Sequence, residues 1–271
     1  MNRRILLAVF AVVAIGVGYF VYEIIDTDAP DEVSTEAALE QLAAEVSQES
    51  DESDDTEAGD VSEPDASTDA TATDDATTEE GAEELGVEAT WTVDDDFGEF
   101  GFDNASGSFA GFRVDKAFFS GVDAVAVGRS GSVTGEFVIG SGELSSANIV
   151  VDMTAMESDD AARVSAINSA IQVNDHPTAT FVVDAPVALD TDALAAGDTV
   201  AVDVEGQLTI AGSTNTITVP IEATVVEDGF GLVVGSTTIT WADYGVETPS
   251  SSVADVADEG VLEFQLVVRS A

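Results

Sequence analysis

The sequence predicts an all-β domain with one helix, folded as a sandwich or a barrel. The clearest observation is the segment 200–226, in which apolar and polar residues alternate along two arms. Successive side chains of a strand point to opposite faces of a sheet, so each arm is expected to be a half-buried strand. Similar segments recur at short intervals after residue 89. Roughly eight to ten strands at such spacing are typical of sandwiches and barrels.

The two arms of this segment form a predicted hairpin. On the first arm the apolar residues of one parity are Val200, Val202, Val204, Leu208 and Ile210. On the second arm they are Ile217, Val219, Ile221, Ala223 and Val225. Residues 211–215 are small, mostly polar and contain a glycine, as expected of a hairpin loop. Pro220 falls on the polar parity and donates no backbone hydrogen bond, which indicates an edge, a bulge or a barrel corner.

Further strands are expected on both sides of the hairpin. In chain order they cover Trp91–Val93, 108–114, 133–139, 147–153, 180–187, 232–240 and 261–268. One helix is predicted over 158–173, with Ser158 as its N-cap and two aspartates at the positive end of its dipole. Its apolar stripe is Val164, Ile167 and Ile171. We expect this helix to pack over one opening of a barrel. Residues 191–196 suffice for one helical turn.

Composition limits the classes of function. The chain has 271 residues, with 7 Lys and Arg against 54 Asp and Glu, and a net charge of −47. So large an acidic excess repels nucleic acid, and we expect no nucleic-acid partner. There is no cysteine, which excludes disulfides, thiol catalysis and zinc–thiolate sites.

An uncharged apolar stretch, Ile5–Tyr22, follows Arg3 and Arg4 near the N-terminus. Its 18 residues are near the minimum for a helix that spans a bilayer. The arginines place its start in the cytoplasm, and the aromatic residues at its end suit the far interface. Residues 1–25 are therefore predicted to be a single-pass anchor in the cell membrane, with the domain on the extracytoplasmic side. The alternative is a cleaved signal peptide, for which Gly16 and Gly18 offer a site.

Residues 26–88 are predicted to be a disordered acidic linker. They hold few large apolar side chains and cannot bury a core. Their like charges repel one another, which favours an extended tether. Within them, 37–46 has leucines at helical spacing, although an isolated helix of this length is marginal. The folded domain is then 89–271, which is large enough for a full core.

Five motifs of this domain, taken in order, carry a family resemblance. They are Trp91–Asp94, Val133–Phe137, His176–Phe181, Val204–Gly212 and Thr238–Val246, with the predicted helix after the second. Over roughly residues 90 to 271 the domain resembles the YceI-like family of lipocalin-like, polyisoprenoid-binding proteins. The resemblance implies an extended antiparallel eight-stranded β-barrel with a helix closing one end. It also implies a long apolar pocket for an isoprenoid or similar lipid tail, which an eight-stranded barrel is wide enough to hold.

Trp241 departs from the family pattern, because a basic residue is expected before the Asp-Tyr-Gly turn. If that residue holds a ligand head group in relatives, the head group bound here is different or absent.

The candidate ligand-binding residues are large apolar side chains and nearby cations. The apolar ones are Phe109, Phe112, Phe118, Phe119, Phe137, Phe181, Leu208, Trp241 and Phe264. The cations, expected to meet a phosphate at the mouth of the pocket, are Arg113, Lys116 and Arg129. The competing interpretation is that the apolar residues fill a solid core and the cations pair with surface carboxylates. A cavity would distinguish the two interpretations.

No residue pattern predicts catalysis, a metal site or a cofactor. His176 is the only histidine, and without a cysteine or a second histidine it is a poor metal or nucleophile site. The sequence has no serine elbow, phosphate loop or dinucleotide fingerprint. The protein is therefore predicted not to be an enzyme.

The leading hypothesis is a membrane-tethered extracytoplasmic barrel that binds an apolar chain such as an isoprenoid lipid or a quinone. The alternative is a structural or interaction module displayed on a stalk, with a filled barrel. A third hypothesis, an enzyme acting on a lipid-like substrate, requires polar groups that converge inside the barrel. A homodimer is compatible with each of these.

Overall fold

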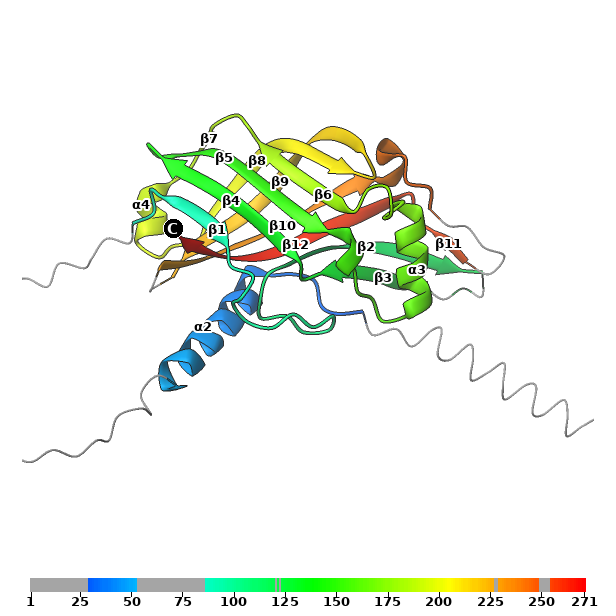
Figure 1. Cartoon of the computed structure of the whole chain (residues 1–271), viewed down its shortest axis with the longest axis horizontal. Coiled ribbons are helices and arrows are strands. Elements are labelled where there is room, and N and C mark those ends of the chain that lie inside the picture. The colour runs from blue at the N-terminus through cyan, green and yellow to red at the C-terminus, as the bar shows by residue number, and fades with distance from the viewer. Residues whose placement is uncertain (1–28, 53–85, 120, 122, 227–228, 249–253) are drawn as a thin grey trace, which may run out of the picture.

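The computed structural model describes residues 29–52, 86–119, 121, 123–226, 229–248 and 254–271 (Figure 1). The predicted anchor, 1–25, lies outside the described residues. Within the described ranges, none of the helices combines the length and the apolar character that crossing a bilayer requires.

Eight antiparallel strands form a closed barrel, which is the architecture that the family resemblance implied (Figure 1). In spatial order they are β1 (Thr90–Val93), β4 (Val133–Gly140), β5 (Glu143–Asp152), β6 (Thr178–Val183), β8 (Val200–Ile210), β9 (Ser213–Val225), β10 (Phe230–Thr240) and β12 (Glu259–Ser270). The barrel closes where β1 pairs with the end of β12, with Trp91 opposite Ser270.

A second hairpin lengthens the barrel wall at one end. Its strands are β2 (Phe109–Phe118) and β3 (Asp123–Ser130). β2 pairs with the first half of β12, and β1 pairs with the last residues of β12 along the same edge. Two short strands complete the sheet: β11 (Ala254–Val256) pairs with β2, and β7 (Val187–Ala188) pairs with β5.

The predicted hairpin of β8 and β9 is confirmed, with Val200 opposite Ala223 and Ile210 opposite Ser213. Its loop is shorter than expected, because the chain turns at Ala211 and Gly212, which both have positive φ. Such a two-residue turn matches the twist of the flanking strands. Pro220 lies just beyond the last β9–β10 pair, where its missing donor leaves no gap in that ladder.

The predicted helix is α3 (Ala161–Ala170), and it lies at the end of the barrel beside β2 and β3 (Figure 1). Its N-cap is Asp160, whose carboxylate accepts a hydrogen bond from the amide of Ala162. The expectation that Ser158 caps the helix was wrong, because that hydroxyl donates instead to the carbonyl of Val127 on β3. At the opposite end lies α4 (Thr191–Ala195), the expected single turn.

Part of the predicted linker is folded against the barrel. Helix α2 (Thr35–Glu52) covers and exceeds the helix expected at 37–46. Its side chains Ala38 and Leu42 are buried against the outer face of β10 and β12. For residues 29–44 the expectation of an extended tether was therefore wrong, because an apolar face on the barrel supplies the partner that an isolated helix lacks. Most of the remaining acidic stretch, 53–85, lies outside the described residues.

Candidate ligand-binding cavity

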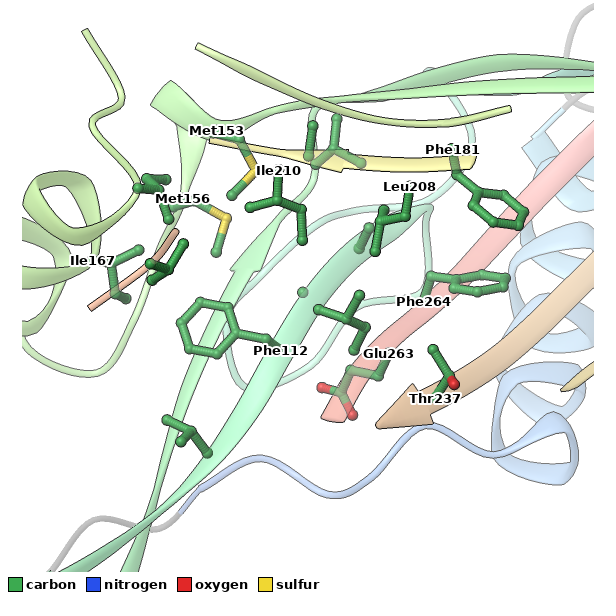
Figure 2. A pocket seen from close by; sticks show the side chains of 18 of the residues that line it. Phe112, Met153, Met156, Ile167, Phe181, Leu208, Ile210, Thr237, Glu263 and Phe264 are labelled. Atoms are coloured by element: carbon green, nitrogen blue, oxygen red, sulfur yellow. The ribbon is translucent and has the colours of Figure 1, made fainter. Parts of the chain in front are cut away.

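The barrel is hollow, with an interior cavity of about 490 Å³ (Figure 2). Its wall is almost entirely apolar and draws side chains from every long strand of the barrel. In Figure 2, Phe112 lies across the space from Met153, Met156 and Ile210. Ligand pockets of proteins commonly have volumes of roughly 300–1,000 Å³, so this space is large enough for a small ligand.

Small residues on the inner face explain why the barrel is not filled. Where large side chains would meet at the centre, the wall carries Ala110, Ala126, Ala147 and Ala179. Phe181 and Phe264 lie inside the barrel yet remain only partly buried, because they face empty space. The closed ladder of strand pairs runs around this space and holds its walls apart.

The cavity opens at the end where α3 lies. The exposed residues among those that line it are Asp160, Ala162, Ala166 and Glu247. They come from the start of α3 and from the segment that follows η3 (Trp241–Tyr244), so the mouth lies between these two elements. The other end is packed: Trp91 and Leu194 are buried there and border a void of only about 50 Å³.

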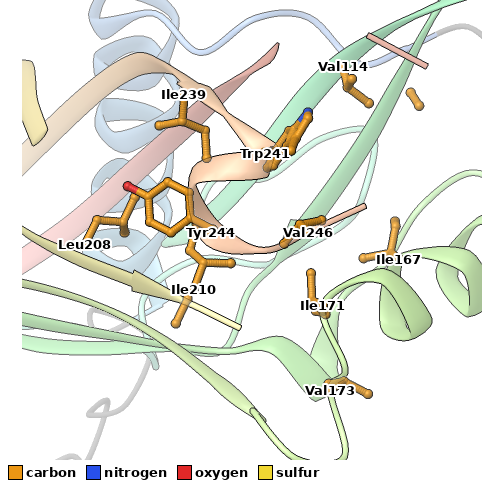
Figure 3. Packing of buried hydrophobic residues seen from close by; sticks show 12 residues of the cluster. Val114, Ile167, Ile171, Val173, Leu208, Ile210, Ile239, Trp241, Tyr244 and Val246 are labelled. Atoms are coloured by element: carbon orange, nitrogen blue, oxygen red, sulfur yellow. The ribbon is translucent and has the colours of Figure 1, made fainter. Parts of the chain in front are cut away.

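A buried apolar cluster forms the wall beside the mouth (Figure 3). Trp241 and Tyr244 of η3 pack there with Ile239 and Val246, and Ile167 and Ile171 approach from the α3 segment. The rings of Trp241 and Phe112 meet edge to face, with centroids 5.5 Å apart. Among the described residues the buried Trp241 Nε1 has no hydrogen-bond partner.

Two cations converge at the mouth. Lys116 and Arg163 both line the cavity. Burial, followed by the charge of Arg163, lowers the pKa of Lys116. Arg163 forms an ion pair with Asp159 one turn earlier. In the part of the barrel that the structure describes, Lys116 is the one Lys or Arg without an ion pair.

Several predicted residues do line the cavity. These are Phe112, Lys116, Phe137, Phe181, Leu208, Trp241 and Phe264. Their contact with a ligand stays a prediction. The sequence interpretation missed Arg163, Met153 and Met156, among others. Arg163 lies on the predicted helix, and its position over the barrel opening was the available signal.

The other predicted residues lie elsewhere. Arg113 and Arg129 do not reach the mouth, because both pair with Glu263 on the outer face of the sheet. Phe109 lies beneath the Arg129 guanidinium, 4.6 Å from it, and Phe118 lies 5.0 Å from the Lys116 ammonium. Phe119 is 65 % exposed. The alternation of side chains along β2 explains why Arg113 does not reach the cavity. Phe112 and Lys116 share the parity that faces the cavity, and Arg113 has the opposite parity.

Nothing in the cavity resembles a metal or catalytic centre among the residues that the structure describes. No group of three or more His, Asp or Glu is placed to hold a metal there. His176 does not line the cavity, and its imidazole lies against the backbone of Gly212 instead.

A comparison with protein-family models matches residues 84–268 to the YceI-like domain. None of the curated proteins matches the sequence.

Solved structures include similar chains. One is a polyisoprenoid-binding domain from Saccharophagus degradans implicated in plant cell wall breakdown, with 16 % identity and a TM-score of 0.48, covering 60 % of this chain and 98 % of that one. Another is BcnA of Burkholderia cenocepacia, with 22 % identity and a TM-score of 0.44, covering 58 % and 95 %. A third is the YceI protein of Campylobacter jejuni, with 16 % identity and a TM-score of 0.44, covering 53 % and 84 %.

Proposed function

The chain belongs to the YceI-like family, and from this premise we propose that it binds one apolar chain, an isoprenoid lipid or a quinone-like molecule, inside its barrel. We further propose that residues 1–25 hold it in the cell membrane with the barrel on the extracytoplasmic side. The observation that carries the binding proposal is the apolar cavity of about 490 Å³ with one open end.

The physical basis of binding is the removal of apolar surface from water. Each buried CH₂ group contributes roughly 0.8 kcal/mol, so a chain of a few isoprene units gains enough to offset its loss of freedom. The wall offers aromatic and aliphatic contacts along its length and few polar groups, which are chiefly Lys116, Arg163 and their neighbours at the mouth. The polar end of the ligand is therefore expected at the α3 end and its tail in the interior.

The alternative of a displayed module with a filled barrel loses its main requirement, since the interior is hollow. An enzyme acting on a lipid would need polar groups that converge inside. The polar residues that line the cavity away from the mouth include Thr180, Thr237 and Glu263. The Glu263 carboxylate is paired with Arg113 and Arg129, so these residues offer no free acid–base or nucleophilic pair. We therefore retain the proposal that the protein is a binding protein and not an enzyme.

Tryptophan fluorescence of the full chain in detergent micelles tests the proposal. The chain has 2 Trp, and Trp241 borders the main cavity whereas Trp91 borders only the small void. A quinone with a short isoprenoid tail should quench Trp241 saturably, and a Trp91→Phe variant should retain that quenching. Ala147→Phe, which places a ring inside the cavity, should weaken binding by about tenfold or more. The matched control is Asn148→Phe, one residue along β5 on the outer face. Saturable binding that Ala147→Phe leaves unchanged, or the absence of any saturable binding, contradicts the proposal.

A further inference from the structure

We infer that the α3 end of the barrel docks on the lipid surface of the bilayer that holds the chain's own N-terminal segment, so that the cavity mouth opens onto the membrane. This inference rests on the anchor of the proposed function and adds an orientation and a contact surface to it. Three observations carry it: an exposed aromatic side chain, the path of the N-terminal arm, and the reach of the chain between arm and anchor.

The exposed aromatic side chain is Phe119, at the end of β2. Across the described residues it is the only large apolar side chain that is exposed, with 65 % of its surface accessible. It follows Phe118, and Lys116 of the cavity mouth lies on the same strand. Aromatic side chains with a cation nearby are favoured where a protein meets the lipid head groups. The described end of β2 thus carries an exposed aromatic side chain suited to a membrane contact, and Lys116 on the same strand lines the mouth.

The N-terminal arm, residues 29–44, is fixed to the barrel by polar and apolar contacts. Arg113 donates to the carbonyl of Pro30, and Arg129 donates to the carbonyl of Asp31 at 2.7 Å. Farther along the arm, Leu42 packs with Val267, near the closed end of β12. Because β12 runs from the mouth toward the closed end, the arm enters from the mouth side. In Figure 1 the first described residues lie below β3, and α2 leads away from α3.

The number of residues before the arm limits how far the barrel can stand from a membrane. Tyr22, the last residue of the uncharged stretch, precedes Ala29 by seven residues, which span at most about 25 Å. Along β2, Phe119 lies six residues beyond Arg113, or about 20 Å at the rise of a strand. The chain between the anchor and the arm, at most about 25 Å long, is therefore similar in length to the distance of about 20 Å from Arg113 to Phe119. The acidic residues 53–85 follow α2, so they add nothing to the length between anchor and barrel.

Charge selects the kind of lipid surface. The net charge of −47 opposes contact with anionic head groups, and Asp159, Asp160 and Glu247 surround the mouth. Zwitterionic lipids remove this repulsion while still accepting an aromatic side chain. Docked in this way, the mouth between α3 and Val246–Thr248 lets an apolar chain pass from bilayer to barrel with little exposure to water.

The absence of cysteine allows a single-label test on the full chain in phosphatidylcholine vesicles. Ala117→Cys, exposed on β2 beside the tip, carries a polarity-sensitive fluorophore and keeps Phe119 in place. The control is Ala196→Cys, exposed beside α4 at the opposite end. We expect a blue shift and quenching by brominated lipid at position 117 only. Phe119→Asp should abolish that signal and slow quinone exchange with vesicles about tenfold, the order expected for losing one aromatic contact.

Flotation of the vesicles separates the two ways in which the inference fails. If the chain floats with the vesicles and both labels report water, the docking is overturned while the anchor stands. If the chain does not float, the anchor fails and the docking fails with it. If position 117 reports lipid equally with Phe119→Asp, Phe119 does not hold the barrel on the membrane and the inference is wrong. In each case, quenching of Trp241 by quinone measures separately whether the cavity binds the quinone.

Discussion

Arg129 donates two hydrogen bonds to one carboxylate oxygen of Glu263, from Nε at 2.9 Å and from Nη2 at 2.7 Å. The second oxygen of this carboxylate accepts from Arg113 Nε at 3.0 Å. Glu263 is only 2 % exposed, so one buried anion holds two buried cations. Nη2 of Arg113 donates to the carbonyl of Pro30 and Nη2 of Arg129 donates to that of Asp31, so the N-terminal arm covers this cluster. Nη1 of Arg129 donates to the carbonyl of Phe102.

Glu263→Gln should lower the free energy of unfolding by about 3–5 kcal/mol, because it leaves two buried guanidinium groups without their counter-ion. Urea denaturation followed by circular dichroism measures the loss. Arg163→Gln is the matched control, since its partner Asp159 lies one turn away on the surface and such a pair contributes only about 0.2–0.5 kcal/mol. Equal effects of the two substitutions would contradict the role assigned to Glu263.

Leu42→Asp should release the N-terminal arm from the barrel. Leu42 is 1 % exposed between α2 and the outer face of β10 and β12, and removing such an apolar side chain costs about 2 kcal/mol or more. Limited proteolysis should then cut within residues 29–52 while the barrel stays intact. Glu40→Ala, exposed on the same helix, should leave the arm protected. Protection that survives Leu42→Asp would show that the arm is held by its polar contacts alone.

Asp152, the last residue of β5, makes stability depend on pH. Hydrogen bonds from the hydroxyl and the amide of Thr154 lower the pKa of Asp152 below 3.8. Since the folded pKa lies below the unfolded one, this carboxylate stabilises the protein above about pH 4 and loses that effect as the pH falls through the lower folded value. The difference in unfolding free energy between wild type and Asp152→Asn should therefore shrink from pH 6 to pH 2. A difference that is constant with pH would refute this assignment.

Gly260→Ala should disturb the wall beside the mouth. A Cβ at this position would stand 2.1 Å from Cζ2 of Trp241 and 2.9 Å from the backbone oxygen of Arg113. The indole, which lines the cavity, has to shift, at a cost of about 1–3 kcal/mol. We expect altered Trp241 fluorescence and weaker quinone binding. Gly140→Ala serves as the control, because nothing lies within 4 Å of its added Cβ. A normal emission spectrum with Gly260→Ala would mean that the indole does not move.

The strands with a clean alternation were predictable, and β10 was also predicted, over 232–240, but the cover on its outer face was not. The β8–β9 hairpin has one apolar parity, and the structure buries that parity. β10 reads as a continuous apolar run from Phe230 to Val234, which is typical of a strand that is buried on both faces. From that run, an element that packs on the outer face of β10 could have been inferred, and α2 is that element. β3 was missed because its residues, DAVAVGRS, show no clear alternation.

The candidate site was predictable in part. Residues of one parity on β2, such as Phe112 and Lys116, could be assigned to the interior once a barrel was expected. The placement of Arg129 depends on pairing between β3, β2 and β12, because only that pairing brings it beside Glu263. Gly111 takes part in this arrangement, since a Cβ there would stand 2.9 Å from Cγ of Arg129. Contacts between elements that are distant in the sequence leave no local residue pattern from which they could be predicted.

The hollow interior also determines how the protein responds to compression. An empty space of about 490 Å³ disappears when the chain unfolds, so unfolding of the unliganded form reduces the volume of the system. Hydrostatic pressure should therefore unfold the empty barrel more readily than a solid barrel of equal size. A guest that occupies the hollow removes most of this volume change, which makes the filled protein the pressure-resistant form.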